Sequence, residues 1–142
     1  MESKSVSELA HPLLRVTFAL IMLTHGLPKI LGLPHGTMAD PMGATTQAIA
    51  NVLHLPAPAV FAGLVAMLES FGAVLLLLGI QTRIVAALMV VEMLVAAYVH
   101  APAFSWVDRG MEMPVLMGLV ALFFALRGGG PLSVDRRLGW GV

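Results

Sequence analysis

Six ionisable side chains interrupt stretches of the sequence that are otherwise almost wholly apolar. Carboxylates, imidazoles and amines are the groups that exchange protons with a substrate or polarise its oxygen atoms. His25 and Lys29 are one helical turn apart, so in a helix they lie on the same face. Glu92, Ala96 and His100 follow at the same spacing and form one slowly turning stripe. We take six residues as candidates for a site: His25, Lys29, Glu69, Glu92, His100 and Glu112.

The composition around these residues is that of a membrane protein. Of the 142 residues, 58% are hydrophobic and 11% are charged, and the mean hydropathy is +0.91; a soluble domain carries about 25% charged residues. The length suits one compact unit, so we expect a single membrane domain over residues 1–142. The net charge of zero indicates no nucleic-acid partner. The chain has no cysteine, which excludes disulfides and thiol exchange by its own side chains.

Four segments are long and apolar enough, or nearly so, to cross a bilayer, which takes about 20 residues of helix. Because unpaired backbone groups are not tolerated in lipid, we predict an all-α membrane protein, a bundle of four transmembrane helices. The fourth segment is short and must tilt little. A short interfacial helix is expected within the long loop, near residues 44–54. The predicted helices cover about 13–33, 58–80, 83–101 and 111–126, and the external loop covers 34–57.

Lysine and arginine residues lie almost entirely at one end of this bundle. Since cytoplasmic loops carry an excess of these residues, we expect both termini to be cytoplasmic. The basic residues of that end are Lys4, Arg15, Arg83, Arg127, Arg136 and Arg137, whereas the opposite end has Arg109 alone.

The depth of the candidates suggests that they share one polar chamber. A charge at mid-membrane costs about 2.5–3.5 kcal/mol on insertion scales. At a rise of about 1.5 Å per residue, Glu69 and Glu92 lie about 14–16 Å from the cytoplasmic end, and the other four lie further out. A chamber in the outer half would shield all of them from lipid. One lysine cannot neutralise Glu69, Glu92 and Glu112, so at least one carboxyl must be protonated, hydrated or bound to a ligand.

Each candidate also has a purely structural interpretation, which stays open. Lys29 could form an interhelical ion pair that fixes packing, Glu112 could anchor a helix at the interface, and His100 could be an ordinary interface histidine. Pro28 cannot donate to the carbonyl oxygen of Thr24, so a kink is expected there. The second helix carries small residues that would let a neighbouring helix approach closely, namely Ala62, Gly63, Ala66 and Gly72.

Five motifs in register resemble the DoxX family. They are HGLPK (25–29), LESFGAVLLLLGIQTR (68–83), AAYVHAP (96–102), the glutamate that opens the fourth helix, and GGGPLSVD (128–135). The resemblance implies a four-helix, multi-pass protein of the bacterial inner membrane. Relatives in that family are linked to quinone-coupled sulfur oxidation, to complexes that handle oxidative and thiol stress, and to quinone detoxification. The family's recurrent polar positions correspond here to His25, Lys29, Glu69, Arg83, His100, Glu112 and Asp135, whereas Glu92 is a candidate by its depth alone.

Three functions stay open at this point. The first is an integral membrane subunit of a quinone-linked redox system, with Glu69 as proton carrier and with His25 and Lys29 polarising the quinone head group. Such an oxidoreductase subunit would need a soluble redox partner for electrons, since the sequence has no haem, Rossmann or cysteine motif. We therefore expect no intrinsic cofactor beyond a bound quinone and no metal site. The second is a non-catalytic scaffold or assembly factor for soluble redox enzymes, and the third is a small proton-coupled permease. A homo-oligomer in the lipid bilayer is compatible with each.

Overall fold

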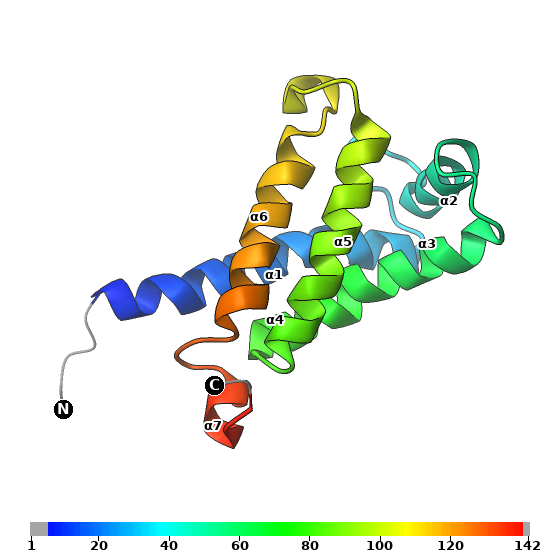
Figure 1. The fold of residues 1–142 in the computed structure, drawn as a ribbon. Helices are drawn as coiled ribbons and strands as arrows, with labels where there is room; N and C mark the ends of the chain where they lie inside the picture. The colour runs from blue at the N-terminus through cyan, green and yellow to red at the C-terminus, as the bar shows by residue number, and fades with distance from the viewer. Residues whose placement is uncertain (1–5, 141–142) are drawn as a thin grey trace.

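Helices make up the regular structure of the chain. The computed structural model describes residues 6–140, so Lys4, counted above among the basic residues, lies outside the described part. Within residues 6–140 there is no strand, and one isolated antiparallel bridge joins His35 to Met38. The elements, shown in Figure 1, are α1 (Val6–Leu31), α2 (Pro41–Asn51), α3 (Pro58–Met67), the π-helical turn η1 (Leu68–Gly72), α4 (Ala73–Leu78), α5 (Thr82–His100), the 3-10 turn η2 (Trp106–Asp108), α6 (Glu112–Arg127) and α7 (Val134–Leu138).

In the described part of the chain, three helical runs are long and apolar enough to cross a membrane. They are Glu8–Leu31, Pro58–Leu78 and Thr82–His100, and the second passes without a break through α3, η1 and α4. α6 has 16 residues, just under the usual transmembrane range of about 17–25. α1 is already helical at Val6, well before the expected start near residue 13, and it continues through both Pro12 and Pro28. The expected helix in the loop is present as α2, which begins three residues earlier than predicted because Asp40 caps it at Pro41.

The helices form two pairs that cross each other. α1 packs along α3, η1 and α4, while α5 and α6 lie side by side and cross the first pair steeply (Figure 1). α2 packs on α3 at one end, which we call the α2 end and which also holds the connection from α5 to α6. The opposite end, the α7 end, holds the turn at residues 79–81 and the segment 128–140. The core between the pairs is built mainly from Phe18, Met22, Leu76, Met89 and Phe124.

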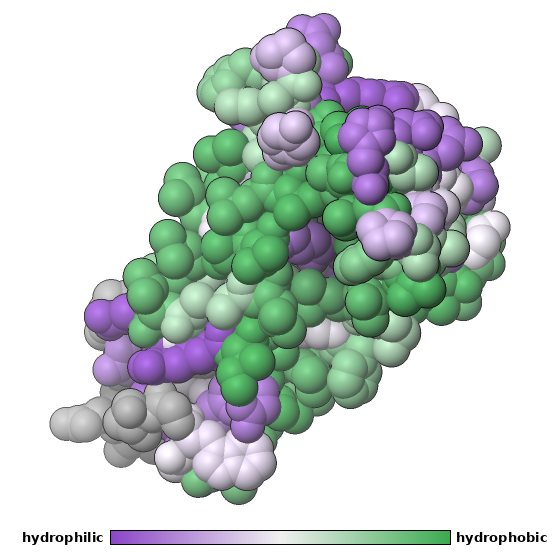
Figure 2. Space-filling model, turned by 45° about the vertical axis from the view of Figure 1, so that its right-hand side comes forward, coloured by the Kyte–Doolittle hydropathy of each residue, from purple (hydrophilic) through white to green (hydrophobic). Residues whose placement is uncertain are grey.

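The outer surface between the two ends is apolar. Large side chains such as Leu88, Val91, Leu94 and Leu119 are more than half exposed. Figure 2 shows this as a broad hydrophobic zone, with hydrophilic residues gathered toward the two ends. Exposing such a large apolar surface to water is unfavourable, so this zone is the part of the protein that contacts lipid.

Two buried polar side chains join the C-terminal segment to the rest of the α7 end. Asp135 accepts the backbone N–H groups of Gln81 and Thr82 at 2.7 and 2.9 Å, so its carboxylate caps the start of α5. Arg15, only 2% exposed, donates from α1 to the carbonyl oxygens of Gly129 and Leu132. These bonds hold α7 against α1 and α5 although the three elements are far apart in sequence.

α1 approaches the second helical run closely at Gly26. A Cβ atom placed on Gly26 would lie 2.6 Å from the carbonyl carbon of Glu69 and 2.7 Å from the nitrogen of Ser70. Only glycine fits, because these are backbone atoms of η1 that cannot rotate away. Gly63, expected above to serve this purpose, has open space where its Cβ would be. Ala62 and Ala66, in contrast, are fully buried as small contact residues.

This difference gives a matched pair of substitutions. Gly26→Ala should lower the thermal unfolding midpoint of the protein in mild detergent, because overpacking typically costs about 1–3 kcal/mol. Gly63→Ala should leave the midpoint unchanged or raise it, since alanine is the better helix former and meets no neighbour. Equal losses from the two substitutions would show that α1 does not contact η1 in this way.

Candidate functional site

An ion pair lies at the contact between α1 and η1. The ammonium of Lys29 pairs with Oε2 of Glu69, and the two side chains are only 11% and 7% exposed. Lys29 is in the last turn of α1, one turn beyond Gly26, so the close helix contact brings the two charges together. The interhelical pair is the structural role considered for Lys29 above, and the structure names Glu69 as its partner.

Glu92 of α5 lies next to this pair. Its carboxylate is close enough to interact with both Glu69 and Lys29. Both of its oxygens are buried, and neither accepts a hydrogen bond from a nitrogen or hydroxyl donor among residues 6–140. The carboxyl of Glu69 lies within hydrogen-bond reach, so a proton held between the two groups would join them. The three side chains come from three different segments, α1, η1 and α5, which pack on one another here. Two carboxylates therefore share one ammonium group in the interior of the bundle.

His25 forms the edge of the cluster. Its side chain is exposed, yet it lies near Glu69 and Lys29. The ring of His35, from the loop after α1, stacks against it at a tilt with a centroid distance of 4.6 Å. His35 was not a candidate from the sequence, because a loop residue has no periodicity that would place it beside a helix. We call His25, Lys29, Glu69 and Glu92 the four-residue cluster.

The π-helical turn shapes the wall of this cluster. It buries Glu69 and Ser70 together, although neighbouring residues of a helix point in different directions. Single π turns inside α-helices are often found at functional sites. The Ser70 hydroxyl is buried against Gly26 and also has no partner in the described part of the chain. Nothing in the sequence pattern distinguishes a π turn from an ordinary helical turn.

The cluster belongs to the apolar zone and not to either end of the molecule. Glu69 lies well inside the run Pro58–Leu78, and Glu92 lies midway along α5. Figure 2 shows hydrophilic atoms at the bottom of a hollow in the middle of the hydrophobic surface. Ionisable groups at this depth are costly and are usually functional or tightly paired.

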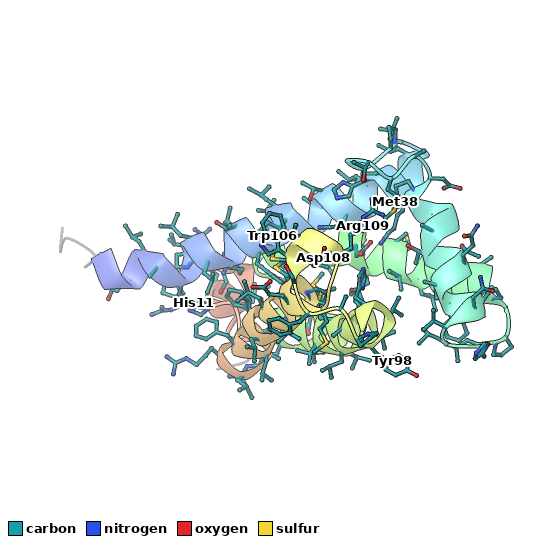
Figure 3. All side chains as sticks on the ribbon, turned by 90° about the horizontal axis from the view of Figure 1, so that it is seen from above. His11, Met38, Tyr98, Trp106, Asp108 and Arg109 are labelled. Atoms are coloured by element: carbon teal, nitrogen blue, oxygen red, sulfur yellow. The ribbon has the colours of Figure 1, made fainter. Side chains whose placement is uncertain are left out.

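The structure gives the other two candidates separate local partners. His100 is exposed, and its Nδ1 is 2.7 Å from the carbonyl oxygen of Ala96, one turn earlier in α5. Glu112 accepts the backbone N–H of Trp106 at 3.1 Å and so closes the α5–α6 connection. That connection also reaches the loop after α1, where Arg109 donates to Thr37 at 2.6 Å, close to Met38 (Figure 3). Of the six candidates, the structure thus shows four that interact with one another, and it gives His100 and Glu112 local hydrogen bonds.

The remaining polar positions carried over by resemblance lie at the α7 end. Arg83 is exposed at the start of α5, and Asp135 caps that helix from α7. Among the residues that the structure describes, no three His, Asp or Glu side chains are arranged to hold a metal ion.

Comparison with known proteins places these features in a family. The sequence matches the DoxX family over residues 11–102, which is more than half of the chain. The chain belongs to the DoxX family. The match contains the whole four-residue cluster and ends before Glu112 and Asp135. It confirms the resemblance read from the sequence motifs, and with the three apolar helices it makes this DoxX chain a membrane protein.

A curated relative extends the similarity beyond the family match. The DoxX chain is 28% identical over 135 residues to an uncharacterized protein of Haemophilus influenzae (strain ATCC 51907 / DSM 11121 / KW20 / Rd), covering 87% of each sequence. No solved structure matches the chain.

The ion pair makes a testable prediction about stability. Lys29→Met should lower the unfolding midpoint strongly, because removing one partner of a buried pair costs about 3–5 kcal/mol. The double variant Lys29→Met/Glu69→Gln should recover much of the loss. Compared with Lys29→Met alone, it buries one fewer carboxyl group that lacks a cation. Arg109→Met is the matched control, because Arg109 is exposed at the α2 end. Simple additivity of the two single changes in a double-mutant cycle would contradict the pairing.

Proposed function

We propose that this DoxX chain is an integral membrane subunit of a quinone-linked redox system, and that the four-residue cluster binds the head group of a quinone or a similar small molecule. The observation that carries the proposal is Glu92: its carboxyl oxygens are buried beside an ion pair inside the apolar zone, and no nitrogen or hydroxyl of the described structure donates to either of them. A proton shared with Glu69 supplies a partner for one oxygen of Glu92. Since buried polar atoms are almost always hydrogen-bonded, the other oxygen calls for a donor from outside the chain.

The residues present fit a quinone head group. A quinone carries two carbonyl oxygens, which need hydrogen-bond donors, and its reduced form carries two hydroxyl groups, which need acceptors. His25 and Lys29 offer donors, while Glu69 and Glu92 offer acceptors or, with a proton, a further donor. A quinone dissolves in the lipid that contacts this part of the molecule, and the exposed side chain of His25 lies at the edge of the cluster.

The cluster has the charge balance that proton exchange requires. Two carboxylates and one ammonium group are neutral together when the carboxylates hold one proton between them. From this neutral state, Glu69, paired with Lys29, and its neighbour Glu92 can give the shared proton to a bound molecule and later regain it, so the charge of the site changes by only one unit. When a quinone is bound, it supplies the redox chemistry, taking up two electrons and two protons. The electrons would come from a soluble redox partner, since the chain has no cysteine and no redox motif.

The proposal includes a membrane orientation. We infer that α6 is a fourth span, that the chain lies in a bacterial inner membrane, and that the α7 end is cytoplasmic. The α7 end carries Arg15, Arg83, Arg127, Arg136 and Arg137, and an excess of arginine and lysine marks the cytoplasmic side. α6 packs along the whole of α5, so it follows α5 through the bilayer and needs little tilt.

The orientation can be tested because the chain contains no natural cysteine. In intact cells, a membrane-impermeant maleimide should label Gln47→Cys in α2 and should fail to label Arg137→Cys in α7. Both positions are exposed, so reactivity is matched, and both should label once the cells are opened. If both variants were labelled in intact cells, α2 and α7 would lie on the same side of the membrane. The three proposed spans between them would then be wrong.

The ligand is tested by gentle purification followed by mass spectrometry of the extracted lipids. Wild-type protein should retain a quinone, and Glu92→Gln should reduce the retained amount about tenfold, because a hydrogen bond to a charged or acidic group contributes about 1.5–3 kcal/mol. No nitrogen or hydroxyl of the described chain donates to Glu92, and a glutamine amide can still donate to Glu69, so this change should leave folding intact.

Glu112→Gln is the control, since its carboxylate caps the α5–α6 connection away from the cluster. It should retain quinone at the wild-type level. A wild-type protein that carries soluble redox partners but never a quinone would reject the proposal in favour of the scaffold function. Proton flux driven by a substrate in liposomes, abolished by Glu69→Gln, would favour the permease instead.

A further inference from the structure

A second place with unpartnered polar atoms lies at the α7 end, apart from the four-residue cluster. A cavity of about 220 Å³ opens there between the first turn of α5, the glycines after α6, and α7. Its lining includes Thr82, Arg83, Gly129, Asp135 and Trp140. None of these residues takes part in the proposed quinone site, so the inference stands independently of that function.

Thr82 supplies the observation that points to a ligand. Its side chain is completely buried, and its hydroxyl has no hydrogen-bond partner within residues 6–140. The hydroxyl lies against Gly129, where a Cβ would come within 2.8 Å of it. A buried hydroxyl without a partner is unfavourable by about 1–3 kcal/mol unless something binds it. Since Thr82 lines the cavity, the missing partner can come from a molecule in that cavity.

The charged residues around the cavity fit a ligand head group that carries both a positive and a negative charge. Asp135 uses each carboxylate oxygen for one backbone N–H, and a carboxylate has acceptor sites for further donors. Arg83 is exposed at the rim, with its guanidinium free to meet a phosphate. A purely anionic head group would place negative charge next to Asp135. A head group that combines a phosphodiester with a primary ammonium satisfies both residues.

An apolar stripe leads away from the same cavity. Ile84 lines the cavity and is 61% exposed, and Leu88 and Val91 continue along the same face of α5 at helical spacing. Trp140 also lines the cavity, and tryptophan is enriched at the boundary between lipid and water. A molecule held here would have its polar part in the cavity and its apolar part along α5.

From these features we infer that the cavity binds one phospholipid of the ethanolamine class. The ammonium group contacts Asp135 and the Thr82 hydroxyl, the phosphodiester contacts Arg83, and an acyl chain lies along Ile84, Leu88 and Val91. A choline head group fits poorly, because its nitrogen has no N–H to donate. Free phosphate lacks both the ammonium group and the chain.

The inference is tested by native mass spectrometry of the delipidated protein titrated with ethanolamine, choline and glycerol phospholipids of identical acyl chains. The wild-type protein should bind the first ethanolamine phospholipid about tenfold more tightly than the other two, the ratio expected for one charge-assisted hydrogen bond. Thr82→Val should reduce this preference severalfold, since only the contact with Asp135 then remains for the ammonium group. Because the hydroxyl has no partner in the described chain, the same change should leave the unfolding midpoint of the lipid-free protein unchanged or higher.

Further variants separate this site from general lipid contact. Arg83→Gln should weaken binding of all three phospholipids, whereas Arg109→Gln, at the α2 end, should change none. Thr46→Val at the α2 end, where the hydroxyl already bonds to Met42, should keep the ethanolamine preference. Equal binding of the ethanolamine and choline lipids, a preference for the glycerol lipid, or displacement by millimolar inorganic phosphate would each overturn the inference.

Discussion

The contact between Gly26 of α1 and the backbone of η1 determines where the charges of this protein meet. A side chain at position 26 would collide with the main chain of Glu69 and Ser70, so its absence allows the two helices to touch. Lys29 lies one turn further along α1 and therefore comes against Glu69. α5 packs on the same π turn and adds Glu92. The whole four-residue cluster thus follows from one position that has no side chain.

The free-energy cost of burying the charges of the four-residue cluster is not fully offset by interactions among its own residues, and this makes the cluster informative. An ion pair that is removed from water loses hydration free energy. The attraction between its charges offsets this loss only when the neighbouring polar groups also have hydrogen-bond partners. In this DoxX chain one ammonium serves two carboxyl groups, and no nitrogen or hydroxyl of the described structure donates to the oxygens of Glu92. A purely structural pair would need Lys29 and Glu69 alone. The additional carboxyl adds cost without adding packing, which favours a role in binding or proton exchange.

Sequence reasoning predicted the elements well and the site only in part. Long apolar runs give helices, so the helical architecture and the approximate bounds of α3 to α6 could be expected. Depth along a helix correctly marked Glu69 and Glu92 as central, but depth says nothing about the direction in which a side chain points around the bundle. His100 and Glu112 lie at a suitable depth and yet bond to their own backbone surroundings. The π turn and the His35 ring depend on packing between segments, which no local pattern encodes.

The unpartnered polar atoms of residues 6–140 fall into two groups, with Nε of the buried Arg15 belonging to the group at the α7 end, and their surroundings imply different kinds of ligand. Ser70 and Glu92 lie in the apolar interior, where neither water nor head groups are at hand, so a partner must itself be soluble in lipid or be a proton. Thr82 lies at the end of a span, beside arginine and tryptophan side chains, where the polar heads of lipids are the most abundant molecules. Both positions belong to α5 or to the turns packed against it. If both proposals hold, this helix carries one ligand position in the centre of the membrane and another at its surface.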